Sequence, residues 1–153
     1  MDMSNSYLRL LQLIERLHRQ LLEVIKDELE RVGQNDVNAV QALLIYNIGE
    51  SELTAGELRS RGHYLGSNVS YNLKKLVESG YIRHKRSDAD RRSVRVSLTD
   101  EGRDLRERIS GLFERHLGSV EKVGDINSEM VDTTNLTLDR LERFWIDQVR
   151  YRL

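Results

Sequence analysis

The chain has 153 residues, of which 39% are hydrophobic, enough for one domain or for a smaller core with helical extensions. It contains no cysteine, which excludes disulfide bonds, thiolate zinc sites and cysteine-based redox sensing. The first residues lack the basic and apolar regions of a signal peptide, and no apolar run approaches the ~18 to 20 residues of a membrane span. A soluble cytoplasmic protein is therefore expected.

The formal net charge of −1 conceals a strong segregation of charge along the chain. Between Arg59 and Arg95 there are ten Lys and Arg residues against three acids, a local charge of +7 that leaves −8 for the remainder. One contiguous cationic segment in an otherwise acidic chain indicates a surface that binds a polyanion. A solvated basic face is the alternative that charge alone leaves open.

The absence of proline allows long helices, so a mainly α fold is expected. Apolar residues at every third or fourth position predict an amphipathic helix from Tyr7 to Val32. A second helix, capped by Asn35 or Asp36, is predicted to run up to Gly49.

Two shorter helices follow in the cationic segment. Thr54 and Glu57 have the spacing of a capping box and predict a third helix that ends at Gly62. After a tight connection, a fourth helix is predicted from Ser67 to Ser79.

After the fourth helix, apolar residues occur at every second position, which is the spacing of a strand and not of a helix. Residues 81–86 and 93–98 are predicted to form two antiparallel strands joined by a charged loop at 87–92. Thr99 is predicted to cap a fifth helix, and a last helix follows a break at residues 124–128.

The third and fourth helices form a predicted helix-turn-helix, and the two strands form its wing. In such a unit the second helix enters the major groove of DNA, so it must be apolar on its inner side and polar or cationic on its outer side. The fourth helix has this division, with small polar residues placed to read base edges and lysines placed to contact phosphates. The predicted DNA contacts on this helix are Ser67, Asn68, Ser70, Tyr71, Lys74 and Lys75.

The motifs of this region resemble those of the MarR family of winged helix-turn-helix transcriptional regulators. They are Leu73-x-x-Leu76-x-x-x-Gly80-Tyr81, Asp90-Arg91-Arg92 and Val96-x-Leu98-Thr99-x-x-Gly102. The resemblance implies that Arg91 or Arg92 reaches the minor groove and that Asp90 braces the wing. Arg86, beside the wing, completes the predicted DNA contacts.

The implied fold class is mainly α (α+β), a winged helix-turn-helix with N- and C-terminal dimerisation helices. Residues 1–34 and 101–153 are expected to intertwine in a homodimer, and residues 35–100 to form the DNA-binding lobe. The apolar residues of the terminal helices also favour pairing, since they are too many for one lobe to cover. The resemblance further implies a ligand-responsive repressor that binds a pseudo-palindromic double-stranded operator.

The family also implies a small phenolic or anionic effector bound between the dimerisation helices and the lobes. Aromatic character and the family layout make four residues candidate walls of its pocket: His18, Tyr46, Tyr64 and Phe113.

Three other classes of function compete with DNA binding. A winged-helix module that docks an acidic protein partner is the main alternative. The four histidines lie on separate predicted elements without ligand spacing, so no metal site is expected. Neither a cofactor nor enzymatic activity is expected, because the sequence shows no nucleophile arrangement and no phosphate-binding loop.

Overall fold

The computed structural model describes residues 2–62, 66–86 and 94–152. The chain divides into two compact units, Met1–Leu112 and Phe113–Leu153, and their boundary falls inside one helix. No helix among the described residues has both the length and the apolar character needed to cross a membrane.

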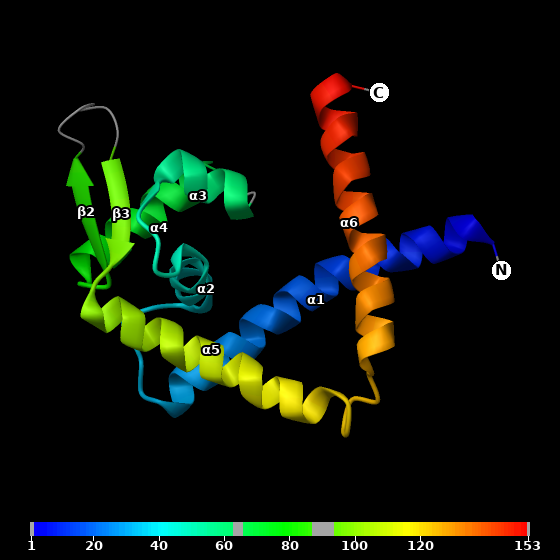
Figure 1. The fold of residues 1–153 in the computed structure, drawn as a ribbon, viewed down its shortest axis with the longest axis horizontal. Coiled ribbons are helices and arrows are strands. Elements are labelled where there is room, and N and C mark those ends of the chain that lie inside the picture. The colour runs from blue at the N-terminus through cyan, green and yellow to red at the C-terminus, as the bar shows by residue number, and fades with distance from the viewer. Residues whose placement is uncertain (1, 63–65, 87–93, 153) are drawn as a thin grey trace. The chain divides into compact units, whose positions relative to one another are not determined.

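The first unit combines helices with a small sheet (Figure 1). Its elements are α1 (Met3–Arg31), α2 (Ala39–Ile48), β1 (Leu53–Thr54), α3 (Ala55–Gly62), α4 (Gly66–Glu78), β2 (Ile82–Arg86), β3 (Val94–Leu98) and the first part of α5 (Asp100–Val120). The described elements confirm the mainly α class and the predicted helix-turn-helix followed by two strands.

The sheet has three antiparallel strands in the order β1-β3-β2. Ile82 lies opposite Leu98, and Lys85 lies opposite Arg95. The third strand, β1, was not predicted: it has only two residues, too few to show an alternating pattern.

The hydrophobic core of the first unit is centred on α2. This helix is apolar on most of its circumference, which is typical of a helix surrounded by other elements. The core residues contributed by helices are Ile25, Leu29, Ala42, Leu44, Ile45, Ile48, Leu58, Val69, Leu73, Leu76, Leu105, Ile109 and Leu112. Those contributed by the strands are Leu53, Ile82, Val96 and Leu98.

The start of α2 corrects the predicted cap. Its N-cap is Asn38, not Asn35 or Asp36. The Asn38 side chain accepts a hydrogen bond from the Gln41 backbone N–H at 2.8 Å, and the Gln41 side chain accepts one from the Asn38 N–H at 3.1 Å. Asp36 is engaged elsewhere, since its carboxylate accepts a hydrogen bond from the Tyr81 hydroxyl at 2.8 Å.

Two other predicted caps agree with the structure, whereas the first helix starts earlier than predicted. The Thr54 hydroxyl accepts from the Glu57 N–H at 3.0 Å, and the Thr99 hydroxyl accepts from the Gly102 N–H at 3.2 Å, which confirms both caps. The first helix begins four residues earlier than predicted, at Met3, because Asp2 supplies its cap.

The first turn of α5 is held tightly against the chain that enters β2. The Thr99 hydroxyl donates to the Gly80 carbonyl at 2.6 Å. A Cβ atom at Gly102 would lie 2.2 Å from the Tyr81 carbonyl oxygen, so only glycine fits here. This contact gives a physical reason for glycine in the Leu-Thr-x-x-Gly motif.

The second unit contains the end of α5 and α6 (Ser128–Tyr151). The Asn127 side chain caps α6 by accepting from the Met130 N–H at 2.9 Å. None of the residues of α6 is buried, although many are large and apolar. Its exposed large apolar residues are Met130, Val131, Leu136, Leu138, Phe144, Trp145, Val149 and Tyr151.

Candidate nucleic-acid interface

The helix-turn-helix holds α4 by its apolar side. Leu58 of α3 is fully buried, and Val69, Leu73 and Leu76 of α4 lie in the same core. Successive residues of a helix are separated by about 100°, so the side of α4 opposite these three faces solvent. Figure 1 shows α3 and α4 beside the β2–β3 hairpin.

The exposed side of α4 carries the predicted contacts that the structure describes. These exposed residues are Asn68, Ser70, Tyr71, Lys74 and Lys75. Tyr71 is 61% exposed, and the Lys75 Nζ lies 5.8 Å from the centroid of its ring. The Lys75 Nζ also lies 3.9 Å from the Glu78 carboxylate, whereas Lys74 forms no ion pair with a described residue. The Ser67 side chain lies outside the described part.

A second cationic surface lies on the outer face of the sheet. Arg83 and Lys85 lie on the face of β2 opposite the buried Ile82, and Arg95 lies directly opposite Lys85 on β3. All three side chains are exposed. We call Arg83, Lys85 and Arg95 the sheet-face cluster.

The electrostatics of the sheet-face cluster favour an anionic partner. Two like charges directly opposite each other on neighbouring strands are destabilising. No member of the cluster forms an ion pair with any residue of the described part. A polyanion such as a phosphate backbone supplies the missing counter-charge.

The predicted wing lies mostly outside the described residues. This holds for Arg91 and Arg92, the predicted minor-groove contacts, and for Asp90, the predicted brace. Arg86 is described: it is the last residue of β2 and is exposed.

Hydrogen bonds from α2 help to position α4. Gln41 is buried, and its side-chain amide donates to Asn72 Oδ1 at 3.3 Å. The Asn72 amide in turn donates to the Asn68 carbonyl at 2.9 Å. The cap of α2 is therefore linked to the first turns of the helix that carries the candidate contacts.

A polar cluster connects the segment after α1 to the start of β2. The Tyr81 hydroxyl donates to the Asp36 carboxylate at 2.8 Å. The Gln34 side-chain amide donates to the Asp36 carboxylate and to the Tyr81 hydroxyl oxygen. Burial and the neighbouring Asp36 carboxylate raise the pKa of Tyr81 to about 12. For Asp36, burial raises the pKa, but hydrogen bonds from Tyr81 and Gln34 outweigh it and leave the pKa below its usual value.

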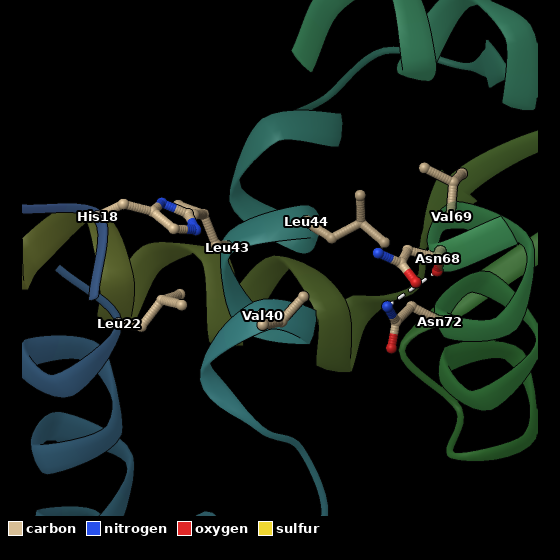
Figure 2. Close-up of a pocket in the computed structure, with 8 residues that line it drawn as sticks. All are labelled: His18, Leu22, Val40, Leu43, Leu44, Asn68, Val69 and Asn72. Carbon is tan, nitrogen blue, oxygen red and sulfur yellow. Dashed lines mark hydrogen bonds between the residues drawn. The ribbon is translucent and has the colours of Figure 1, made fainter. Parts of the chain in front are cut away.

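A pocket of about 210 Å³ opens between α1, α2 and α4 (Figure 2). Its described lining residues are His18, Leu22, Val40, Leu43, Leu44, Asn68, Val69 and Asn72. Figure 2 shows His18 on the α1 side and the two asparagines on the α4 side, with the α2 residues between them.

Of the four residues predicted to line an effector pocket, His18 alone is among the described residues around this one. Tyr46 lies elsewhere, with its ring centroid 5.3 Å from the Arg106 guanidinium carbon. Phe113 belongs to the second unit, and Tyr64 lies outside the described residues.

Comparison with known proteins identifies the family. A model of the winged helix DNA-binding domain matches residues 37–102. The exopolysaccharide II synthesis transcriptional activator ExpG of Rhizobium meliloti (strain 1021) is 39% identical over 150 residues, which cover 95% of this chain and 75% of that protein. The chain belongs to the MarR family of winged-helix transcriptional regulators.

Solved MarR-family structures share the fold. FabT of Streptococcus pneumoniae in complex with DNA matches with a TM-score of 0.70 and 25% identity, over 92% of this chain and 98% of that one. A mutant MarR from E. coli complexed with operator DNA matches with a TM-score of 0.74 and 22% identity, over 92% of this chain and 99% of that one.

The MarR-family motifs did not reveal the sheet-face cluster as a surface. Its three residues were counted in the cationic segment, but their common face depends on the pairing register of β2 and β3. His18 is the one described lining residue of the pocket that was predicted as a wall, because the pocket is formed by residues from three helices. Among the described residues, no three His, Asp or Glu side chains form a group that could hold a metal ion.

Proposed function

We propose that this protein binds a specific double-stranded DNA operator as a homodimer and thereby regulates transcription. In each subunit α4 enters the major groove, and the β2–β3 hairpin with residues 87–92 lies along the backbone and the adjacent minor groove. The observation that carries this proposal is the sheet-face cluster, a set of cations without described counter-charges in the same unit as the exposed polar side of α4. Control of DNA binding by a small molecule is part of the proposal.

The unburied helix α6 supports the homodimer. Its apolar residues include Val131, Leu138 and Trp145, which are spaced by seven and therefore lie along one side of the helix. Pairing with the same helices of a second copy removes this surface from water, with residues 1–34 and 101–153 as the dimerisation segments and residues 35–100 as the lobe. The two recognition helices then lie about 34 Å apart, one turn of DNA, which fits a pseudo-palindromic operator.

The proposal is tested by selecting bound duplexes from a random pool with the full-length protein. We expect a two-fold symmetric consensus, which then serves as the probe for mobility shifts. The double variant Asn68→Ala with Arg92→Ala should abolish the shift while the dimer persists. An unaltered shift with this variant would contradict the assignment of α4 and the wing.

A winged-helix module that docks an acidic protein is the rival. It predicts no enrichment of any sequence in the selection and no duplex binding at low salt. A DNA binder instead loses affinity steeply as salt rises, because phosphate contacts release counterions.

The similarity to ExpG suggests the regulated process. We propose that the protein controls transcription of exopolysaccharide synthesis genes. Repression, predicted from the family, would appear as higher expression of a reporter in a strain without the protein. Activation, the role named for ExpG, would appear as lower expression. A protein that binds an operator acts where the DNA is, so a cytoplasmic location follows from this proposal.

A further inference from the structure

Three side chains on the exposed side of α4 contact one another in sequence. Tyr71, Lys75 and Glu78 are separated by four and three positions, the spacings at which helix side chains are neighbours. The Lys75 Nζ lies over the Tyr71 ring, 5.8 Å from its centroid, and 3.9 Å from a Glu78 carboxylate oxygen. The ammonium group of Lys75 is therefore held between an aromatic ring and an acid.

The two neighbouring lysines of α4 differ in their surroundings. Both are exposed, and both were predicted to contact phosphates. The Glu78 carboxylate offsets the charge of Lys75, whereas Lys74 forms no ion pair with a described residue. An exposed ion pair such as that of Lys75 contributes little to stability, so its main consequence is where it holds the ammonium group. Lys74 is accordingly the better placed of the two to neutralise a phosphate.

Tyr71 is placed to read a base. It follows the first residue of α4 by five positions, and it lies on the same side of the helix as Asn68, three positions before it. The N-terminal residues of the second helix of a helix-turn-helix contact base edges. The Tyr71 ring is 61% exposed, and the ammonium group over one of its faces leaves the other face and the edge open to a ligand. In the major groove, the apolar group of a base edge is the 5-methyl of thymine.

We propose that the Tyr71 ring contacts the methyl group of one thymine in each operator half-site, and that Lys75 positions this ring. The inference rests on the proposed DNA binding and names a specificity-determining residue for it. It departs, for Lys75, from the phosphate contact predicted from the sequence, and it leaves that role to Lys74.

The size of each contribution follows from its chemistry. Covering one methyl-sized group strengthens binding about fourfold, so two symmetric half-sites together give about tenfold or more. A cation–π contact at an exposed site changes an equilibrium by about two- to fivefold. Lys75 supplies this second effect before DNA arrives, because a ring that is already held in place loses less freedom on binding.

The experiment replaces thymine by deoxyuridine, which lacks only the methyl group. In the duplex selected from the random pool, symmetric pairs of thymines are replaced one pair at a time. Fluorescence anisotropy with the full-length protein measures each affinity. We expect one pair at which the replacement weakens binding about tenfold or more.

Variants of Tyr71 separate the ring from the hydroxyl group. Tyr71→Phe keeps the ring and should keep the preference for thymine over uracil at that pair. Tyr71→Ala removes the ring and should bind both duplexes equally. The side chain is exposed, so both variants should fold, which circular dichroism checks.

Variants of the two lysines separate positioning from phosphate contact. Lys75→Gln should reduce the thymine preference by about two- to fivefold, and Lys75→Arg should restore it, because a guanidinium group also stacks on an aromatic ring. Lys74→Gln is the matched control, with the same charge change one position away. It should weaken binding to both duplexes equally and lower the slope of log affinity against log salt by about 1 for each lost phosphate contact. Lys75→Gln should change this slope by less than half as much.

Each contrary result overturns a named part of the inference. Tight duplex binding that is indifferent to uracil at every thymine overturns the methyl contact and leaves the proposed function standing. Loss of the thymine preference in Tyr71→Phe assigns the contact to the hydroxyl group and overturns the role of the ring. An unchanged preference in Lys75→Gln, or a slope change equal to that of Lys74→Gln, overturns the positioning role. Failure to bind any duplex at low salt contradicts the proposed function itself.

Discussion

Gly102 shows how a single residue fixes the position of a helix. Its N–H is bonded to the Thr99 hydroxyl, and its missing side chain leaves room for the Tyr81 carbonyl. Since the chain enters β2 at this point, the close contact also sets where the hairpin begins. Any larger residue must move either α5 or β2.

Gly102→Ala should therefore destabilise the protein by about 2 kcal/mol or more, because a Cβ atom 2.2 Å from a backbone oxygen forces the backbone to shift. Urea unfolding measures the change. Gly118→Ala, in the same helix, has no atom within 4 Å of the new Cβ and should stabilise the protein by about 0.5 to 1 kcal/mol. Equal effects of the two variants would contradict the close contact.

Tyr81→Phe should remove a pH-dependent part of the stability. The pKa of Tyr81 is raised from 10.0 to about 12 in the folded state, so its contribution is present below about pH 10 and is lost as the pH rises towards 12. The pKa of Asp36 is lowered, so its contribution is present above pH 3.8 and is lost as the pH falls below this value. The variant should cost about 1 to 2 kcal/mol at pH 7.

Thermal unfolding across pH 3 to 12 tests this prediction. The wild type should lose stability at both ends of the range more steeply than Tyr81→Phe. Tyr71→Phe is the control, since the exposed Tyr71 has no such carboxylate partner among the described residues, and the loss of its hydroxyl should change stability by less than about 0.5 kcal/mol. Parallel pH profiles for the wild type and Tyr81→Phe would contradict the role of the cluster.

At the scale of elements, the β2–β3 hairpin combines packing with charge. The face that carries Ile82, Val96 and Leu98 completes the core, while the opposite face carries the sheet-face cluster. An antiparallel register places Lys85 and Arg95 side by side, at some cost in stability. A surface that is unfavourable for folding but suited to phosphates points to binding as its role.

Arg95→Gln should accordingly weaken DNA binding and leave the fold as stable as before or more stable, by about 0.2 to 1 kcal/mol. The loss should be uniform across sequences, and the slope of log affinity against log salt should fall by about 1. Arg108→Gln makes the same charge change at an exposed site on α5 and should leave the slope unaltered. An unchanged slope for Arg95→Gln would show that Arg95 contacts no phosphate.

At the scale of the whole molecule, α6 determines the assembly that we propose. None of the 24 residues of α6 is buried, so its large apolar side chains form the surface that a second copy would cover. Its apolar side includes Leu138, whereas Leu136 lies about 200° away around the helix.

Leu138→Asp should therefore convert the homodimer to monomers at micromolar concentration, because it places a charge in the proposed apolar interface. Sedimentation equilibrium gives the mass. Leu136→Asp, on the other side of α6, introduces the same charge and should remain dimeric. A wild-type protein that sediments as a monomer, or dimers of both variants, would contradict this interface.

Most of the helices, strands and caps of this protein could be predicted from the sequence alone, because helix periodicity, strand alternation and capping depend on only a few neighbouring residues. The helix-turn-helix, the strand pair and the caps at Thr54 and Thr99 are local in this sense, and the exposed polar side of α4 follows from its periodicity. The prediction of a helix cap at Asn35 or Asp36 was wrong, because the Asp36 carboxylate accepts a hydrogen bond from Tyr81, a residue 45 positions away.

Only the tertiary structure decided which distant residues meet. The register of β2 and β3 brings Lys85 to Arg95, and the packing of α2 on α4 brings Gln41 to Asn72 across 31 positions. The pocket likewise depends on three helices, whose relative placement follows from how their apolar sides fill a common core. Chain geometry over such separations is set by the packing of the whole unit, which no short stretch of sequence encodes.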